Sequence, residues 1–306
     1  MLDAESLALM RDIIPRHAPT PDMSPVEARA MALALGRLLQ GEPVPMEVEE
    51  RAPEAAAGHA IPLRLYRPSG TTGGWLLWIH GGGFTTGGLD THDTLCRRLA
   101  HLSRQAVISV DYRLAPEHRY PAALDDCETI LDWLFDEATG LGLDVSRGAI
   151  GGSSAGGNLA AALALRHRDK AGPRLRRQIL VYPCVDATMA SDSFARHAAG
   201  YQLTSAMMAQ YLDYYCGPAD RRDPFLSPLF APSLADLPPA EVILAELDPL
   251  VDEGAAYARR LQEAGVATRT TLFDGVMHGF FAQAGALTKA RAAQELACHA
   301  LRHEFG

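Results

Sequence analysis

The sequence predicts an α/β protein whose central sheet is mostly parallel and is flanked by helices. Two observations predict it: short strand-like runs that are nearly all apolar, and helical patterns that separate most of these runs. Apolar runs without polar alternation are typical of parallel strands that are covered on both faces. Regular alternation of strand and helix is the pattern of the crossover units that build such a sheet.

The expected elements cover most of the chain. The strand-like runs are residues 61–67, 75–79, 106–110, 148–151, 178–182, 241–247 and 268–273. The helical patterns that separate and follow them are residues 91–104, 121–138, 155–169, 249–264 and 286–304.

Two parts of the chain depart from this alternation. Helical patterns at 5–14 and 26–39 precede the first strand, and almost 60 residues between Tyr182 and Glu241 contain no convincing strand, although 207–215 has the pattern of a helix. A structureless connection this long is uncommon inside a compact domain. We therefore expect a helical cap formed by 1–44 and 186–225, and a core formed by 45–185 and 226–306.

Composition excludes several classes of protein. With 48% hydrophobic residues among 306, the chain can bury a sizeable core, and its net charge of −9 gives no attraction to nucleic acid. Its five cysteines form no CxxC pair, which argues against a disulfide framework and a zinc site. The acidic N-terminus does not resemble a signal peptide, and no apolar run is long enough to enter a membrane. We expect a soluble, cytoplasmic protein.

Residues 152–156 (GSSAG) match the Gly-x-Ser-x-Gly turn that exposes a nucleophilic serine between a strand and a helix. The preceding residues resemble a strand end, and Asn158 begins a strongly helical run, so Ser154 has the required context. The alternatives are a plain glycine turn and a phosphate-binding loop. The second fails because Asn158 and Leu159 stand where Lys and Ser or Thr are needed.

A glycine-rich loop, residues 80–84 (HGGGF), directly follows the strand at 75–79. Backbone N–H groups of successive glycines can point together at a small anion, as an oxyanion hole requires. The alternative is a flexible turn without function. No dinucleotide-binding GxGxxG pattern fits the glycines of this loop.

A serine nucleophile needs a base and an acid that orients the base. Of the five histidines after Ser154, His278 alone lies in a loop after a strand, at the sheet edge where active-site groups gather. Asp248 follows the strand at 241–247 directly and is the preferred acid, with Asp252 and then Asp274 as alternatives.

These motifs together resemble the bacterial hormone-sensitive-lipase-like esterases (family IV) of the α/β-hydrolase superfamily. The matching segments are 80–84 (HGGGF), 111–117 (DYRLAPE), 120–126 (YPAALDD), 152–158 (GSSAGGN), 248–250 (DPL) and 278–280 (HGF). The resemblance implies an α/β-hydrolase fold with a helical cap, a Ser154–His278–Asp248 triad, and an oxyanion hole made by the backbone of Gly82, Gly83 and Ala155.

The resemblance also predicts the reaction, which is hydrolysis of short- to medium-chain acyl esters of small molecules without a metal or organic cofactor. Amidase, lactonase and deacetylase activities use the same triad and stay open as alternatives. A further alternative is a non-catalytic binding protein, as in the related plant gibberellin receptors. Those receptors lack the catalytic histidine, so the presence of His278 argues against this alternative. Ser153 departs from the family's usual residue beside the nucleophile, which is Asp or, in one branch, Thr. Family members are often homodimers.

Overall fold

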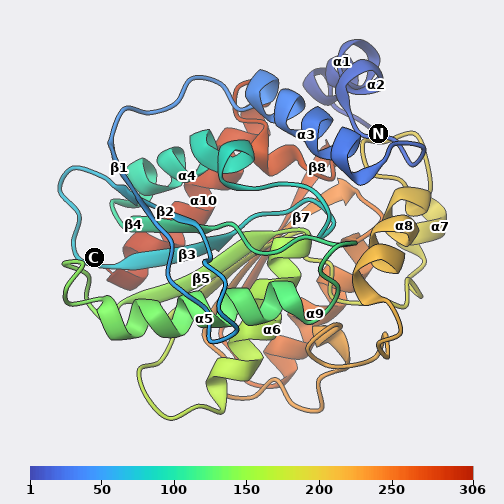
Figure 1. The fold of residues 1–306 in the computed structure, drawn as a ribbon. Coiled ribbons are helices and arrows are strands. Elements are labelled where there is room, and N and C mark those ends of the chain that lie inside the picture. The colour runs from blue at the N-terminus through green and yellow to red at the C-terminus, as the bar shows by residue number, and fades with distance from the viewer. Residues whose placement is uncertain (306) are drawn as a thin grey trace.

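An eight-stranded sheet forms the centre of the protein in a computed structural model that describes residues 1–305 (Figure 1). The spatial order is β1-β2-β4-β3-β5-β6-β7-β8; β1 pairs with β2 and β2 with β4 in antiparallel fashion, and the remaining pairs are parallel. The strands are β1 (Glu47–Arg51), β2 (Leu63–Arg67), β3 (Trp75–Ile79), β4 (Ala106–Val110), β5 (Gly148–Ser153), β6 (Arg177–Val181), β7 (Ala240–Leu247) and β8 (Thr268–Met277). The predicted fold class and all seven predicted strands are confirmed.

The edge strand β1 is the one strand that the sequence analysis did not predict. Its five residues, EVEER, include a single apolar side chain, Val48, and the strand pairs on one side only. Edge strands do not need the apolar runs that identify buried strands, and charged residues protect their free side. Its pattern was therefore too polar to stand out.

Helices cover both faces of the sheet. One face carries α4 (Leu89–Ser103) and α10 (Thr288–Phe305), and the other carries α5 (Ala122–Glu137), α6 (Ala155–Arg168) and α9 (Val251–Glu263) (Figure 1). Strand β3 is buried on both sides: its odd-numbered residues belong to one hydrophobic cluster and its even-numbered residues to the other. Each large side chain buried in this way contributes about 2 kcal/mol to folding.

Two helical segments lie beside each other at the carboxyl ends of the parallel strands (Figure 1). The N-terminal segment contains α1 (Ala4–Asp12), α2 (Ile14–His17) and α3 (Pro25–Leu39), and the inserted segment contains α7 (Ser193–Arg196) and α8 (Ser205–Cys216). A hydrogen bond of 2.9 Å from Gln210 Nε2 to the Pro21 carbonyl joins them. Short 3-10 turns at Pro228–Phe230 and Phe280–Ala282 complete the described elements. The helical prediction for 207–215 is confirmed by α8.

An ion pair and two hydrogen bonds attach the N-terminal segment to the rest of the molecule. Arg29 of α3 donates to both carboxylate oxygens of Glu117, at 2.9 and 2.6 Å, and to the carbonyls of Thr85 and Ala115.

None of the helices in the described chain combines the length and the apolar character that crossing a bilayer requires.

Candidate active site

Ser154 occupies a tight turn between β5 and α6. Its backbone has φ 57° and ψ −119°, a conformation that L-residues rarely adopt and that aims the side chain out of the sheet edge. A Cβ at Gly152 would collide with the carbonyl of Gly156, and a Cβ at Gly156 would collide with the carbonyl of Ile79. The two glycines therefore permit the close approach of strand, turn and helix that exposes Ser154.

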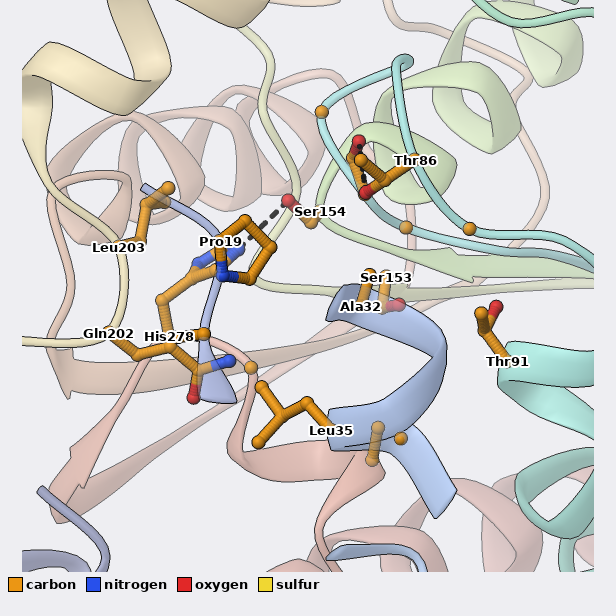
Figure 2. Close-up of a pocket in the computed structure, with 18 of the residues that line it drawn as sticks. Pro19, Ala32, Leu35, Thr86, Thr91, Ser153, Ser154, Gln202, Leu203 and His278 are labelled. Carbon is orange, nitrogen blue, oxygen red and sulfur yellow. Dashed lines mark hydrogen bonds between the residues drawn. The ribbon is translucent and has the colours of Figure 1, made fainter. Parts of the chain in front are cut away.

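A continuous hydrogen-bonded chain joins three of the predicted residues, and Figure 2 shows the part of it between Ser154 and His278. His278 Nε2 lies 2.8 Å from Ser154 Oγ, and His278 Nδ1 lies 2.7 Å from Asp248 Oδ2. Asp248 is fully buried, and its other oxygen accepts a hydrogen bond of 2.9 Å from the Leu250 amide. The carboxylate can only accept, so Nδ1 carries the proton and Nε2 is left as the acceptor for the serine hydroxyl.

The two alternative acids lie elsewhere. Asp252 forms a 2.6 Å ion pair with Arg196, and Asp274 is 87% exposed and pairs with Lys289. Neither has a hydrogen bond to His278 among the described residues. Of the three candidate acids, Asp248 is therefore the one that lies in contact with His278.

His278 follows β8 directly because that strand is longer than predicted. The expected end at Phe273 coincides with an irregularity: the pairing of β7 with β8 shifts register between Ala245 and Leu247, and Gly275 adopts a φ of +64°. The Gly275 amide donates a 2.7 Å hydrogen bond to Glu246 Oε2, after which β8 continues to Met277. Bulges of this kind re-aim side chains beside active sites.

The glycine loop lies next to the nucleophile. Gly82 and Gly83 have φ values of +119° and +60°, and a Cβ at Gly81 would approach the Ser153 carbonyl to 2.8 Å. Within residues 1–305, the amides of Gly82, Gly83 and Ala155 donate no hydrogen bond to another protein group. Unpaired amides beside a nucleophile are the arrangement that an oxyanion hole requires.

His80 is a buried residue that contacts the backbone of this loop. It is fully buried, its Nδ1–H donates to the Gly81 carbonyl at 2.8 Å, and its own carbonyl accepts from Tyr112 Oη at 2.9 Å. Burial lowers the pKa of His80 to about 4, so the ring is neutral at neutral pH. Tyr112, in the matching segment 111–117, thus makes a structural contact with this loop.

A pocket of about 190 Å³ opens over Ser154 and His278 (Figure 2). Most of its wall is apolar, and both helical segments contribute to it. The apolar lining residues are Ala18, Pro19, Ala32, Leu35, Leu39, Leu203, Met207, Met208 and Ala282. Met207 and Met208 of α8 belong both to a hydrophobic core cluster and to the pocket wall.

Ser153 and three glutamines, Gln40, Gln202 and Gln283, belong to the polar part of the pocket wall. Ser153 is 4% exposed and places a hydroxyl in the pocket wall. The sequence analysis missed Gln202 and Gln283, which also line the pocket. No motif marks them, because they lie in the insertion and in a turn after His278 and are brought together only by folding.

The fold and the hydrogen-bonded serine, histidine and aspartate define a serine hydrolase of the α/β type. Residues 76–282 match the family described as alpha/beta hydrolase fold. The chain belongs to this family.

Similar proteins carry esterase names. The chain is 40% identical over 277 residues to an ethyl acetate hydrolase of Pseudomonas putida, covering 88% of this chain and 85% of that protein. It is 41% identical over 225 residues to an arylesterase of Saccharolobus solfataricus, covering 72% and 73% of the two chains. The solved structure of a hyperthermophilic esterase from Pyrobaculum calidifontis superposes with a TM-score of 0.94 at 36% identity, over 99% of this chain and 98% of that one.

Proposed function

We propose that this protein is a serine carboxylesterase that hydrolyses small esters with short to medium acyl chains. The observation that carries the proposal is the chain of hydrogen bonds from Asp248 through His278 to Ser154, at 2.7 and 2.8 Å. The esterase names of its relatives support the reaction class. The pocket volume supports the chain length, because a cavity of about 150 Å³ holds a benzene-sized molecule.

The reaction begins when Ser154 Oγ attacks the acyl carbon and its proton passes to His278 Nε2. Asp248 stabilises the imidazolium that forms, and the amides of Gly82, Gly83 and Ala155 donate hydrogen bonds to the oxyanion. His278 then gives the proton to the leaving alkoxide, which departs as the alcohol.

Water completes the cycle. It attacks the acyl-enzyme ester while His278 takes one of its protons, the acid leaves, and the proton returns to Ser154 Oγ. All proton transfers pass through one nitrogen, Nε2, so the tautomer that Asp248 imposes serves both halves of the reaction.

The decisive experiment replaces the nucleophile. Ser154→Ala should lower kcat for p-nitrophenyl butanoate by about 10³-fold or more, because the attacking oxygen is gone while the fold is kept. Ser146→Ala, at an exposed serine outside the pocket, is the matched control and should behave as wild type. Turnover by Ser154→Ala close to that of the control would overturn the proposal, as would failure of an organophosphonate to label the wild-type protein.

We propose that residues 1–44 and 186–225 act as the cap, with 45–185 and 226–306 as the catalytic core. Both segments supply pocket-lining side chains, including Leu35 and Leu203. The hydrogen bond between Gln210 and Pro21 supports treating them as one unit over the site.

The proposal extends to location and assembly. A cytoplasmic location is supported by the five cysteines, all of which are buried and unpaired, as in a reducing compartment. A homodimer through the edge of the sheet is supported by β8, an edge strand on which Leu272 is 54% exposed. A sizing column distinguishes monomer from dimer.

A further inference from the structure

Gln202 is a polar residue of the pocket that the proposed mechanism does not use. Gln202, in the inserted segment before α8, lines the pocket together with His278 and Gly279. Figure 2 shows Gln202 on the same side of the pocket as His278, with Ala32 of α3 on the other side. Polar groups in a mostly apolar pocket fix the orientation of the ligand and its specificity.

The Gln202 amide is held by a neighbouring glutamine. Gln283 Nε2 donates a 2.7 Å hydrogen bond to Gln202 Oε1. Gln283 is 3% exposed, its backbone amide donates to the Phe280 carbonyl at 2.9 Å, and its backbone carbonyl accepts from the Leu287 amide at 2.9 Å. Because its oxygen is engaged by this rigid partner, Gln202 has its Nε2 group left to donate.

Three other polar side chains of the wall use their donors internally. Gln40 Nε2 donates to the Thr91 carbonyl, Thr86 Oγ1 to the Gly82 carbonyl at 3.0 Å, and Thr91 Oγ1 to the Gly88 carbonyl at 2.8 Å. Within residues 1–305, Gln202 Nε2 has no hydrogen-bond acceptor. A preorganised donor that is free before substrate binds can form a hydrogen bond to a ligand oxygen without rearrangement of the pocket.

The position of Gln202 identifies the part of the ester that it meets. Its Nε2 lies 3.2 Å from the position that a Cβ of Gly279 would occupy. The Gln202 amide therefore lies directly against Gly279, the residue after His278. Gly279 has a φ of +88° and no side chain, which leaves room for this contact. His278 must protonate the leaving alkoxide, so the alcohol part of the ester lies on the His278 side of Ser154.

We propose that Gln202 is a specificity-determining residue that donates a hydrogen bond to an oxygen in the alcohol part of the substrate. The favoured substrates are esters of oxygen-bearing alcohols, such as ether or polyol alcohols, in preference to esters of plain alkanols of the same size. This inference rests on the proposed esterase function and adds a substrate class to it.

The test uses two esters that differ by one atom. Butyl butanoate and 2-methoxyethyl butanoate share the acyl group and the chain length, and only the second carries an ether oxygen in its alcohol. The measured quantity is the ratio of kcat/KM for the ether ester to kcat/KM for the alkyl ester. Gln202→Met keeps the length of the side chain but removes the donor, and should lower this ratio about fivefold relative to wild type.

Control measurements separate this effect from general damage. Gln262→Met, at an exposed glutamine of α9 outside the pocket, should keep the wild-type ratio. A second ester pair, butyl pentanoate and butyl 3-methoxypropanoate, places the oxygen in the acyl part, and Gln202→Met should leave that ratio unchanged. Gln283→Met keeps Gln202 but removes its partner, so the alcohol-side ratio should fall there too.

Two outcomes would overturn the inference: an alcohol-side ratio that is unchanged in both pocket variants, or a change confined to the acyl-side pair. If Gln202→Met does not fold, the ratio in Gln283→Met decides. Failure of the proposed function looks different, because wild type and Gln262→Met would then hydrolyse none of the esters.

Discussion

Glu253 is a buried carboxyl group whose protonation should make the stability of this protein depend on pH. It is 1% exposed on α9, and its Oε1 accepts hydrogen bonds from the amides of Val185 and Asp186, at 2.7 and 3.2 Å. Its Oε2 has no partner among the described residues. Burial above all, and then repulsion from Asp186 and Asp248, raise the pKa of this carboxyl well above its usual range.

The direction of the effect follows from proton binding. In the unfolded chain Glu253 titrates near its ordinary pKa of 4.5, whereas in the folded protein it keeps its proton to higher pH. Between these two values the folded state binds one more proton, so the free energy of unfolding falls as the pH rises, by up to about 1.4 kcal/mol per pH unit. A glutamine side chain binds no such proton, so the substitution Glu253→Gln removes this contribution.

The magnitude is measurable. From pH 5 to pH 7 the stability of Glu253→Gln should improve relative to wild type by up to about 2.7 kcal/mol. For a chain of 306 residues this corresponds to a rise in Tm of about 4 °C. The glutamine oxygen can keep both backbone hydrogen bonds, so the variant should fold.

Thermal unfolding of wild type and variant in matched buffers at pH 5, 6, 7 and 8 measures the difference. Every other titrating group cancels when the two proteins are compared. Glu263→Gln, at an exposed position of the same helix, is the matched control and should give a curve parallel to wild type. Parallel curves for Glu253→Gln and wild type would refute the reasoning, because Glu253 would then be ionised in the folded protein.

Two further predictions concern the active site. Gly83→Ala would place a Cβ against the ring of Tyr211 at a backbone φ of +60°. The amide of residue 83, a proposed oxyanion donor, would then move, and kcat should fall about 10²-fold. Gly58→Ala, at a φ of +78° in open space, is the control for backbone strain and should keep the wild-type kcat. Asp248→Asn should lower kcat about 10³- to 10⁴-fold, because the amide no longer imposes the reactive tautomer of His278. Ester hydrolysis rates at saturating substrate test both, and wild-type kcat in either active-site variant would contradict its predicted role.

The motifs predicted the site because their residues are constrained locally. The turn around Ser154 needs small neighbours at fixed offsets, and those offsets are visible in the sequence. Asp248 and His278 were identified by their position after strands, since the carboxyl ends of parallel strands meet at one edge. The bulge at Gly275, after which β8 continues to Met277 just before His278, was not predicted, because Asp-Gly has the composition of a turn.

The sequence by itself determined the fold class, the order of the parallel strands along the chain, and the three residues of the predicted triad, because apolar runs and glycine spacing are properties of short segments. The tertiary structure alone decided which side chains surround the substrate. Gln202 and Gln283 are 81 residues apart and meet only because the inserted segment folds over the turn after β8. Their contact leaves no pattern in the sequence, since a single hydrogen bond between distant residues imposes no local periodicity or spacing.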